Sequence, residues 1–147
     1  MSKKALYVIY WDSSAILSTI FKDRHSAEAQ RWSCKESIHL MSTLAYVETC
    51  AVIARMKRER ILADVLLHAA LEVLEKGPWH RLNTWPEWKI IQPLSLKWPL
   101  RGADLWHLAT AKSLKKQLPE LFLLTFDTRL KVAAQGEGMI KKISTGR

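Results

Sequence analysis

Short apolar runs alternate along this chain with segments whose apolar residues recur at helical spacing. Residues 5–11 (ALYVIYW) and 121–126 (LFLLTF) are nearly continuous apolar runs, as in strands that are buried on both faces. Residues 38–42 predict a third strand. The remaining pattern predicts helices over about 13–20, 25–36, 43–60, 61–76, 102–116 and 127–135, and further short strands at 89–92 (KIIQ) and 139–143.

This alternation of strands and helices predicts a parallel sheet between layers of helices. We expect one domain over residues 1–147, of the α/β class, with a three-layer α/β/α architecture and a central, mostly parallel sheet of about five strands. Ser13 or Ser14 is the expected N-cap of the first helix, and Gly77 ends the fourth. Residues 78–99 hold four prolines and four tryptophans and are predicted to form a connector. Its indoles are expected to pack over the sheet or a helix, with a partner surface or base stacking as alternatives.

The charge of the chain narrows the range of partners. It has 23 Lys and Arg against 14 Asp and Glu, a formal net charge of +9. Such a surface attracts polyanions: nucleic acid, an acidic protein or an anionic membrane. No stretch approaches the roughly 18 apolar residues of a membrane-spanning helix. The N-terminal apolar run leads into Asp12 without a small-residue cleavage site, so we interpret it as a strand and expect a cytoplasmic protein.

Four carboxylates stand where a folded chain normally buries carbon. Asp12 and Asp127 directly follow predicted strands, and Asp104 lies in the first turn of a predicted helix. At about 100° per residue, Glu48 falls on the face that its helix is expected to bury, with Thr49 on the polar face. Because an isolated buried charge is costly, buried carboxylates are usually paired or bound to a metal.

The predicted architecture gives two of these carboxylates a common place. Ligands bind outside the carboxyl ends of parallel strands, so Asp12 and Asp127 reach one crevice if their strands are neighbours.

Cys34 and Cys50 lack zinc-type spacing with the five histidines and are expected to be buried thiols. A set of oxygen ligands alone favours Mg²⁺ or Mn²⁺. Such a site activates a water that attacks phosphorus, while a metal ion stabilises the leaving oxygen.

Each carboxylate also has a purely structural interpretation that the sequence leaves open. Asp12 and Asp127 are suitable N-caps for the helices that follow them. Asp104 is placed to complement its helix dipole. Glu48 can pair with Arg55 or with another buried cation. Four coincidences of this kind along one chain are less probable than any one of them.

Four stretches, in order from Tyr10 to Gly138, match the motifs of a known family. They are YWDSSAIL, STLAYVETCAVIAR, LRGADLWHLATAK and LLTFDTRLKVAAQGEG. With these motifs the chain resembles the PIN domains and, among them, the VapC-type ribonuclease toxins of toxin–antitoxin pairs.

The resemblance implies both a site and partners. It implies an acidic quartet that holds Mg²⁺ or Mn²⁺ and cleaves RNA, namely Asp12, Glu48, Asp104 and Asp127. Ser13 and Ser42 match hydroxyl positions near this quartet, and Arg101 is a candidate phosphate contact. Members of the family often form homodimers and are inhibited by an antitoxin that lays a segment across the site. A homodimer and a cognate antitoxin are therefore expected.

Other functions stay open at this point. A non-catalytic RNA-binding module needs the basic surface but no acidic cluster, and an RNA-processing PIN nuclease shares the quartet without acting as a toxin. A phosphatase of the haloacid dehalogenase type has a second Asp two residues after the first, where this chain has Ser14. His107, one turn after Asp104, invites a role as general acid or base, which a metal-activated mechanism does not require. Nucleotide-binding enzymes are disfavoured, because the chain has no GxGxxG or GxxxxGK[ST] loop.

Overall fold

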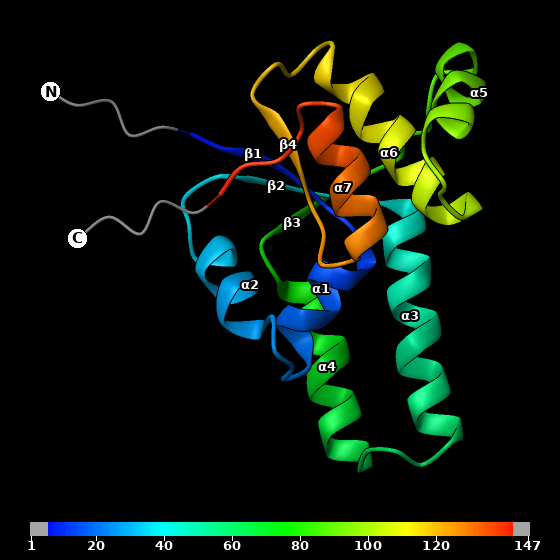
Figure 1. The fold of residues 1–147 in the computed structure, drawn as a ribbon. Coiled ribbons are helices and arrows are strands. Elements are labelled where there is room, and N and C mark those ends of the chain that lie inside the picture. Colours follow the sequence, from blue (N-terminus) through cyan, green and yellow to red (C-terminus); the bar gives the residue numbers. More distant parts are fainter. Residues whose placement is uncertain (1–5, 143–147) are drawn as a thin grey trace, which may run out of the picture.

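The computed structural model describes residues 6–142 of the chain, in which strands and helices follow one another as Figure 1 shows. The strands are β1 (Val8–Trp11), β2 (Ile38–Ser42), β3 (Trp79–Leu82) and β4 (Leu121–Leu124). The helices are α1 (Ser13–Ile20), α2 (Ser26–Ser33), α3 (Thr43–Arg58), α4 (Asp64–Lys76), α5 (Trp88–Lys97), α6 (Gly102–Lys115) and α7 (Thr128–Gly136). Within the described range, no helix is long and apolar enough to cross a membrane.

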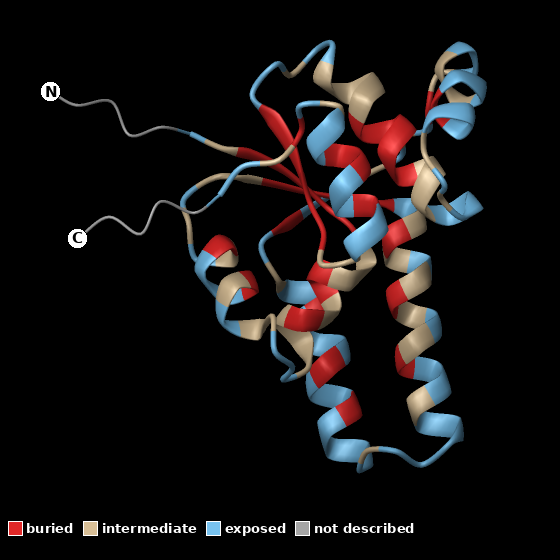
Figure 2. Ribbon diagram, viewed as in Figure 1, coloured by how far each residue is buried: buried red, intermediate tan, exposed pale blue. Residues whose placement is uncertain are grey.

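The strands form a wholly parallel sheet in the order β3-β2-β1-β4. β1 lies between β2 and β4, with Trp11 opposite Met41 on one side and Leu124 on the other. Every residue of β1 and β4 is buried, as the red strands at the centre of Figure 2 show. The two continuous apolar runs of the sequence are therefore the strands that are covered on both faces.

Helices cover both faces of this sheet. Ile9, Trp11 and Met41 point to the face that packs against α1 to α4. Tyr10 and Leu40 point to the other face, which packs against α5 to α7. Successive side chains of a strand alternate between faces, which explains this division. The predicted three-layer α/β/α architecture with a parallel sheet is confirmed.

The C-terminal end of the sheet differs from the prediction. We expected a last strand at 139–143, and residues 139–142 do not form one. Met139 nevertheless accepts a hydrogen bond from the backbone N–H of Leu123 (2.8 Å), so this segment runs beside β4. Residue 143 lies outside the described range.

The tryptophan-rich segment 78–99 is where the sequence prediction was wrong. The predicted strand at 89–92 lies inside α5, and the strand of this segment is β3, which we did not predict. β3 is an edge strand in which only Trp79 is buried, so it has no apolar run to reveal it. Pro93 lies within α5, and proline in a helix interior is a feature that normally argues against a helix.

The side chains of that segment divide into two groups. Trp79 is buried and Trp98 is half-buried, as expected for indoles that pack over the core. Trp85 and Trp88 are 73% and 89% exposed, so the packing expectation is wrong for them. The expectation of two buried thiols is also wrong, because Cys34 is exposed and Cys50 is partly exposed.

Candidate active site at the carboxyl edge of the sheet

The pairing of β1 with β4 brings Asp12 and Asp127 to the same edge of the sheet. Trp11 is opposite Leu124, and the backbone N–H of Asp12 donates to the carbonyl of Leu124 (3.2 Å). Asp127 follows three residues after Leu124. The two strands are neighbours, which was the condition for a common crevice.

Asp12 is buried and held by three hydrogen bonds. Its Oδ1 accepts from the backbone N–H of Ala15 (2.9 Å) and from the hydroxyl of Ser14 (2.7 Å), and its Oδ2 accepts from the hydroxyl of Thr125. Asp12 is therefore the N-cap of α1, and our expectation of Ser13 or Ser14 in that role is wrong. Burial raises the pKa of Asp12, although the hydrogen bonds from Thr125, Ser14 and Ala15 act in the opposite direction.

Asp127, like Asp12, follows a strand of the sheet and is also the N-cap of the next helix, here α7. Its Oδ1 accepts from the backbone N–H of Leu130 (2.9 Å). Thr125 connects the two residues: its hydroxyl donates to the carboxylate of Asp12 and accepts from the backbone N–H of Asp127 (3.1 Å). The capping interpretation of both aspartates is thus correct, and among residues 6–142 no hydrogen bond engages the second oxygen of Asp127.

Two hydroxyl side chains at this edge were not found from the sequence. Ser14 Oγ, besides donating to Asp12, accepts from the backbone N–H of Phe126 (2.9 Å), and Thr125 bridges the two aspartates. Ser13, which the resemblance favoured, makes no side-chain hydrogen bond within residues 6–142, whereas Ser42 accepts from the backbone N–H of Ala45 (3.2 Å) as the N-cap of α3. A Ser two residues after a strand-ending Asp was the only available signal for Ser14.

Glu48 pairs with a histidine that the sequence analysis did not identify as its partner. Its Oε1 lies 2.6 Å from Nε2 of His107, a residue of α6 that is 1% exposed. Nδ1 of His107 lies 2.7 Å from the hydroxyl of Tyr10. Burial raises the pKa of Tyr10 far above its ordinary value, and the negative charges of Asp12 and Glu48 add to this.

The helical phase that we assigned to Glu48 is wrong in part. The buried residues of α3 are Ala45, Thr49 and Ile53, and Thr49 satisfies its hydroxyl by donating to the carbonyl of Ala45 (2.8 Å). The side chain of Glu48 is 29% exposed and lies at the margin of this stripe, where α3 meets α6. Periodicity gave the wrong phase because the buried stripe of α3 contains a threonine, whereas Val47 is 54% exposed.

Asp104 and Asp127 share a hollow of about 400 Å³ with Arg101, Thr128 and Arg129. The hollow lies between the first turns of α6 and α7, whose N-terminal N–H groups favour a bound anion. Burial raises the pKa of Asp104, and the negative charge of Asp127 raises it further. Arg129 was missed from the sequence, although its place two residues after Asp127 puts it in the first turn of α7.

The acidic quartet occupies one electrostatic neighbourhood. Both Asp127 and Glu48 raise the pKa of Asp104, and His107 acts on both Asp104 and Asp12. Within residues 6–142, however, no three His, Cys, Asp or Glu side chains are already close enough to one another to hold a metal ion. The donor chemistry fits Mg²⁺ or Mn²⁺, because every donor is a carboxylate oxygen and a cation relieves the repulsion that raises the pKa of Asp104.

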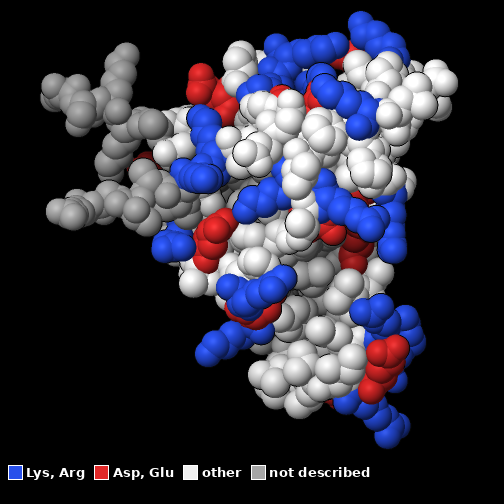
Figure 3. Space-filling model, viewed as in Figure 1, with Lys and Arg blue, Asp and Glu red and all other residues white. Residues whose placement is uncertain are grey.

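Basic side chains surround this edge of the protein. Figure 3 shows Lys and Arg side chains spread over α6 and α7, with acidic side chains among them near the beginning of α7. Arg101 and Arg129 are exposed at the hollow itself. Cationic groups next to a carboxylate cluster are suited to a polyanionic chain whose phosphates approach the carboxylates.

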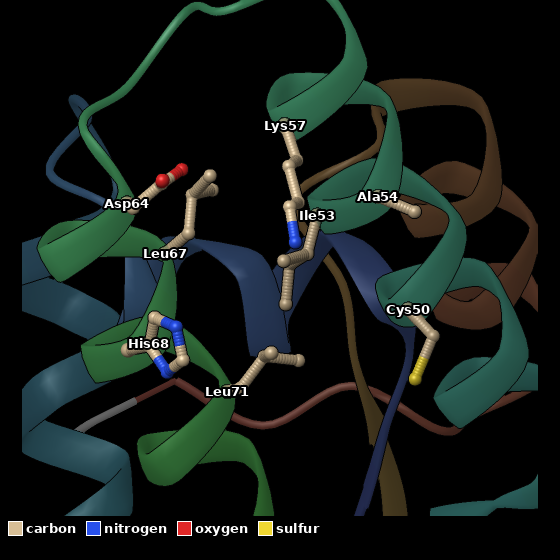
Figure 4. A pocket seen from close by; sticks show the side chains of 8 residues that line it. All are labelled: Cys50, Ile53, Ala54, Lys57, Asp64, Leu67, His68 and Leu71. Atoms are coloured by element: carbon tan, nitrogen blue, oxygen red, sulfur yellow. The ribbon is translucent and has the colours of Figure 1, made fainter.

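A second hollow lies between α3 and α4 and has a different chemistry. Its volume is about 220 Å³, and Ile53 and Lys57 of α3 face Leu67 and Leu71 of α4 across it, as Figure 4 shows. None of the acidic quartet lines it. Because its walls are mainly apolar, it is not suited to bind a phosphodiester.

Comparison with known proteins places this geometry in a family context. The sequence matches the PIN domain family over residues 9–136. The fold is similar to VapC20 of Mycobacterium tuberculosis, described as a toxin that cleaves the sarcin-ricin loop, with 16% identity, a TM-score of 0.56, and coverage of 91% of this chain and 98% of that chain. It is also similar to PAE2754 of Pyrobaculum aerophilum, with 17% identity, a TM-score of 0.61, and coverage of 88% and 81%. At these identities the structural likeness extends to the fold alone. A comparison with curated proteins found no match.

Proposed function

The chain belongs to the PIN domain family, and from this premise we propose that it is a metal-dependent endoribonuclease that acts as the toxin of a type II toxin–antitoxin pair. The observation that supports the proposal most is the hollow that Asp104 and Asp127 share, next to the strand β1 that Asp12 follows; Glu48 of α3 adds to the negative charge that raises the pKa of Asp104. A non-catalytic RNA-binding module has no use for carboxylates that repel one another in this way.

The residues at this edge would have two roles in the site, metal binding and support of the metal ligands. Asp12, Glu48, Asp104 and Asp127 would hold Mg²⁺ or Mn²⁺. When bound, such an ion lowers the pKa of a coordinated water and stabilises developing charge on the leaving oxygen. Ser14 and Thr125 hold the carboxylate of Asp12 in place through hydrogen bonds to its two oxygens.

Binding of the RNA backbone falls to the basic side chains and the helix N-termini. Arg101 and Arg129 flank Asp104 and Asp127 in the hollow, so a phosphate that contacts either guanidinium lies next to the carboxylates. The first turns of α6 and α7 contribute partial positive charge at the same place. Cations thereby bring a polyanion to a site whose own carboxylates repel it.

The activity is tested by incubating the purified full chain with total RNA, with and without Mg²⁺ or Mn²⁺, and mapping the new 5′ ends. We expect cleavage that requires the metal and is abolished in Asp127→Asn, a variant that retains the N-cap of α7 because Asn caps as well as Asp. RNA binding that needs no metal and is unchanged in Asp127→Asn, with no cleavage, would instead identify a binding module.

The toxin role needs its own test, because an RNA-processing nuclease has the same chemistry. Induced expression of the wild-type chain in a bacterial host is expected to arrest growth, and expression of Asp127→Asn at the same level is not. Normal growth with a nuclease that is active in the purified state would favour the RNA-processing alternative.

We also propose an antitoxin and a second copy of the chain as partners. The feature that supports a protein partner is the apolar surface of α4 and of the turn before it, where Val65 is 73%, Leu66 53% and Ile61 54% exposed. Light scattering of the purified chain is expected to give twice the 16.9 kDa of one copy. A mass of one copy at all concentrations would exclude the homodimer.

A further inference from the structure

A continuous series of polar side chains runs through the interior from β2 to the edge of the acidic quartet. The hydroxyl of Tyr10 in β1 is hydrogen-bonded to Ser42 Oγ at the end of β2 (3.1 Å). The same hydroxyl lies 2.7 Å from Nδ1 of His107 in α6. Nε2 of His107 lies 2.6 Å from Oε1 of Glu48 in α3. The imidazole therefore links α6 directly to β1 and α3, and to β2 through the hydroxyl of Tyr10.

The chain contains a second buried histidine that shows what a purely structural arrangement looks like. His39 is 3% exposed; its Nδ1 accepts from the indole N–H of Trp11 (3.0 Å), and its Nε2 lies 3.0 Å from the carbonyl of Lys35. Both ring nitrogens are satisfied by neutral groups in the interior. His107 is equally buried, yet one of its nitrogens contacts a carboxylate that opens towards solvent.

The hydrogen bond between His107 and Glu48 indicates which of the two side chains holds the other in place. An ionised carboxylate can only accept, so Nε2 of His107 donates to Glu48. The imidazole is packed in the core between the hydroxyl of Tyr10 and the carboxylate, with Tyr10 0% exposed. Glu48 is the partner with more rotamer freedom to lose, because its side chain is long and 29% exposed. Within residues 6–142, no hydrogen bond is found to its other oxygen, Oε2.

We propose that His107 is a positioning residue for Glu48, and that Tyr10 in turn holds the imidazole of His107 in the orientation that this requires. This inference rests on the proposed function, because it assigns Glu48 to the metal. One oxygen of Glu48 is bound to His107 before any ion arrives, and within residues 6–142 no hydrogen bond engages the other. Without the imidazole, Glu48 has to lose its rotamer freedom when the metal binds.

A quantitative consequence follows for metal affinity. Groups that hydrogen-bond to the ligands of a metal typically change affinity by about 10- to 100-fold when they are removed. His107→Leu retains an apolar filling of the space but provides no donor, and it is expected to weaken Mn²⁺ binding by about this factor. His107→Gln places an amide N–H donor near the position of Nε2 and is expected to recover most of the loss.

The test uses the full chain and Mn²⁺, with binding measured by calorimetry and folding by circular dichroism. His39→Leu is the matched control: it removes an equally buried histidine that has no carboxylate partner and is expected to leave Mn²⁺ affinity unchanged. Tyr10→Phe removes only the hydroxyl and is expected to weaken Mn²⁺ binding by less than His107→Leu does. The effects of Tyr10→Phe and His107→Leu are expected to be non-additive, because both act through one imidazole.

A metal-free measurement distinguishes positioning from general destabilisation. In the apo protein, ¹⁵N NMR is expected to show a slowly exchanging Nε2–H on His107, which Glu48→Gln shifts and His39→Leu does not. Equal Mn²⁺ affinity in wild type, His107→Leu and His107→Gln would overturn the proposal. If His107→Leu does not fold, Tyr10→Phe decides: unchanged Mn²⁺ affinity together with an unchanged His107 ¹⁵N spectrum overturns it. A wild-type chain that binds no Mn²⁺ and cleaves no RNA would instead refute the proposed function, whatever the NMR shows.

Discussion

The carboxylate of Glu137 lies where α5, α6 and α7 meet, and replacement of Glu137 by Gln measures how far this carboxylate stabilises that junction. Its Oε2 accepts from Lys97 Nζ (2.9 Å) and from the indole N–H of Trp98 (3.0 Å), while Oε1 accepts from Lys112. The side chain is 4% exposed. Burial alone raises the pKa of Glu137, but the bonds from Lys112, Lys97 and Trp98 outweigh it and lower the pKa from 4.5 to about 2.

The size of the effect follows from that pKa. A carboxyl whose pKa falls by this amount on folding is stabilised by about 3 kcal/mol at neutral pH. Lys97 and Lys112 are 59% and 41% exposed, so solvent screening reduces this figure. We expect Glu137→Gln to lower the free energy of unfolding by about 1–2 kcal/mol at pH 7.

The pH dependence gives the sharper test. Because the pKa of Glu137 is lowered in the folded state, its stabilisation is complete above 4.5 and is lost as the pH falls from 4.5 towards about 2. Urea unfolding of wild type and Glu137→Gln is therefore expected to show a difference that shrinks over this range. Other carboxyl groups titrate in both proteins and cancel in the difference.

Glu87→Gln serves as the control for this experiment. Glu87 is also paired with lysines, with Lys116 at 2.9 Å and Lys89 at 3.8 Å, but its side chain is 38% exposed. Its replacement is expected to have a much smaller effect, because exposed ion pairs contribute little. A difference for Glu137→Gln that stays constant down to pH 2, or a Glu87→Gln effect of equal size, would refute the reasoning.

Substitutions at three further positions test the site and its support. Asp127→Asn is expected to abolish metal-dependent RNA cleavage at nearly unchanged thermal stability. Asp127→Ala also removes the hydrogen bond to the backbone N–H of Leu130 and is expected to lower the free energy of unfolding by about 1 kcal/mol. Cleavage retained by both variants would contradict the proposed site. Gly136→Ala places a Cβ 2.3 Å from the ring of Trp98 and is expected to lower the unfolding free energy by about 1–3 kcal/mol; an unchanged melting temperature would show that the indole moves aside freely. Arg129→Gln is expected to raise KM for RNA more than it changes kcat and to weaken the salt dependence of binding; if neither changes, Arg129 does not contact the RNA.

The fold was predictable where a segment's own composition determines its structure. β1 and β4 are covered on both faces, so their sequences are apolar throughout, and β2 begins and ends where it was predicted. β3 was not predicted, because it is an edge strand with mostly exposed side chains. The helix α5 was not predicted either, because it contains Pro93 and its exposed face carries the apolar residues Trp88 and Leu96. Neither helix propensity nor hydrophobic periodicity therefore identified it.

The candidate site shows the same division. Asp12 and Asp127 were predicted to share a crevice because each follows a strand, on the condition that the two strands are neighbours, which β1 and β4 are. Their capping role follows from their place before a helix. His107, Ser14 and Thr125 were missed as supporting residues, because each acts on a residue that is distant in sequence or on a different element. Their partners are a matter of packing, which periodicity does not report.

The sequence by itself determined the α/β alternation, the positive charge and the four acidic positions, because hydrophobic runs, composition and residue spacing are local properties. Only the tertiary structure decided which groups hold those carboxylates. It turned Glu48 to His107 rather than to Arg55, and it set Arg129 beside Asp104. The physical reason is that a hydrogen bond between α3 and α6 depends on how two helices pack against the sheet, a relation that involves residues 59 positions apart.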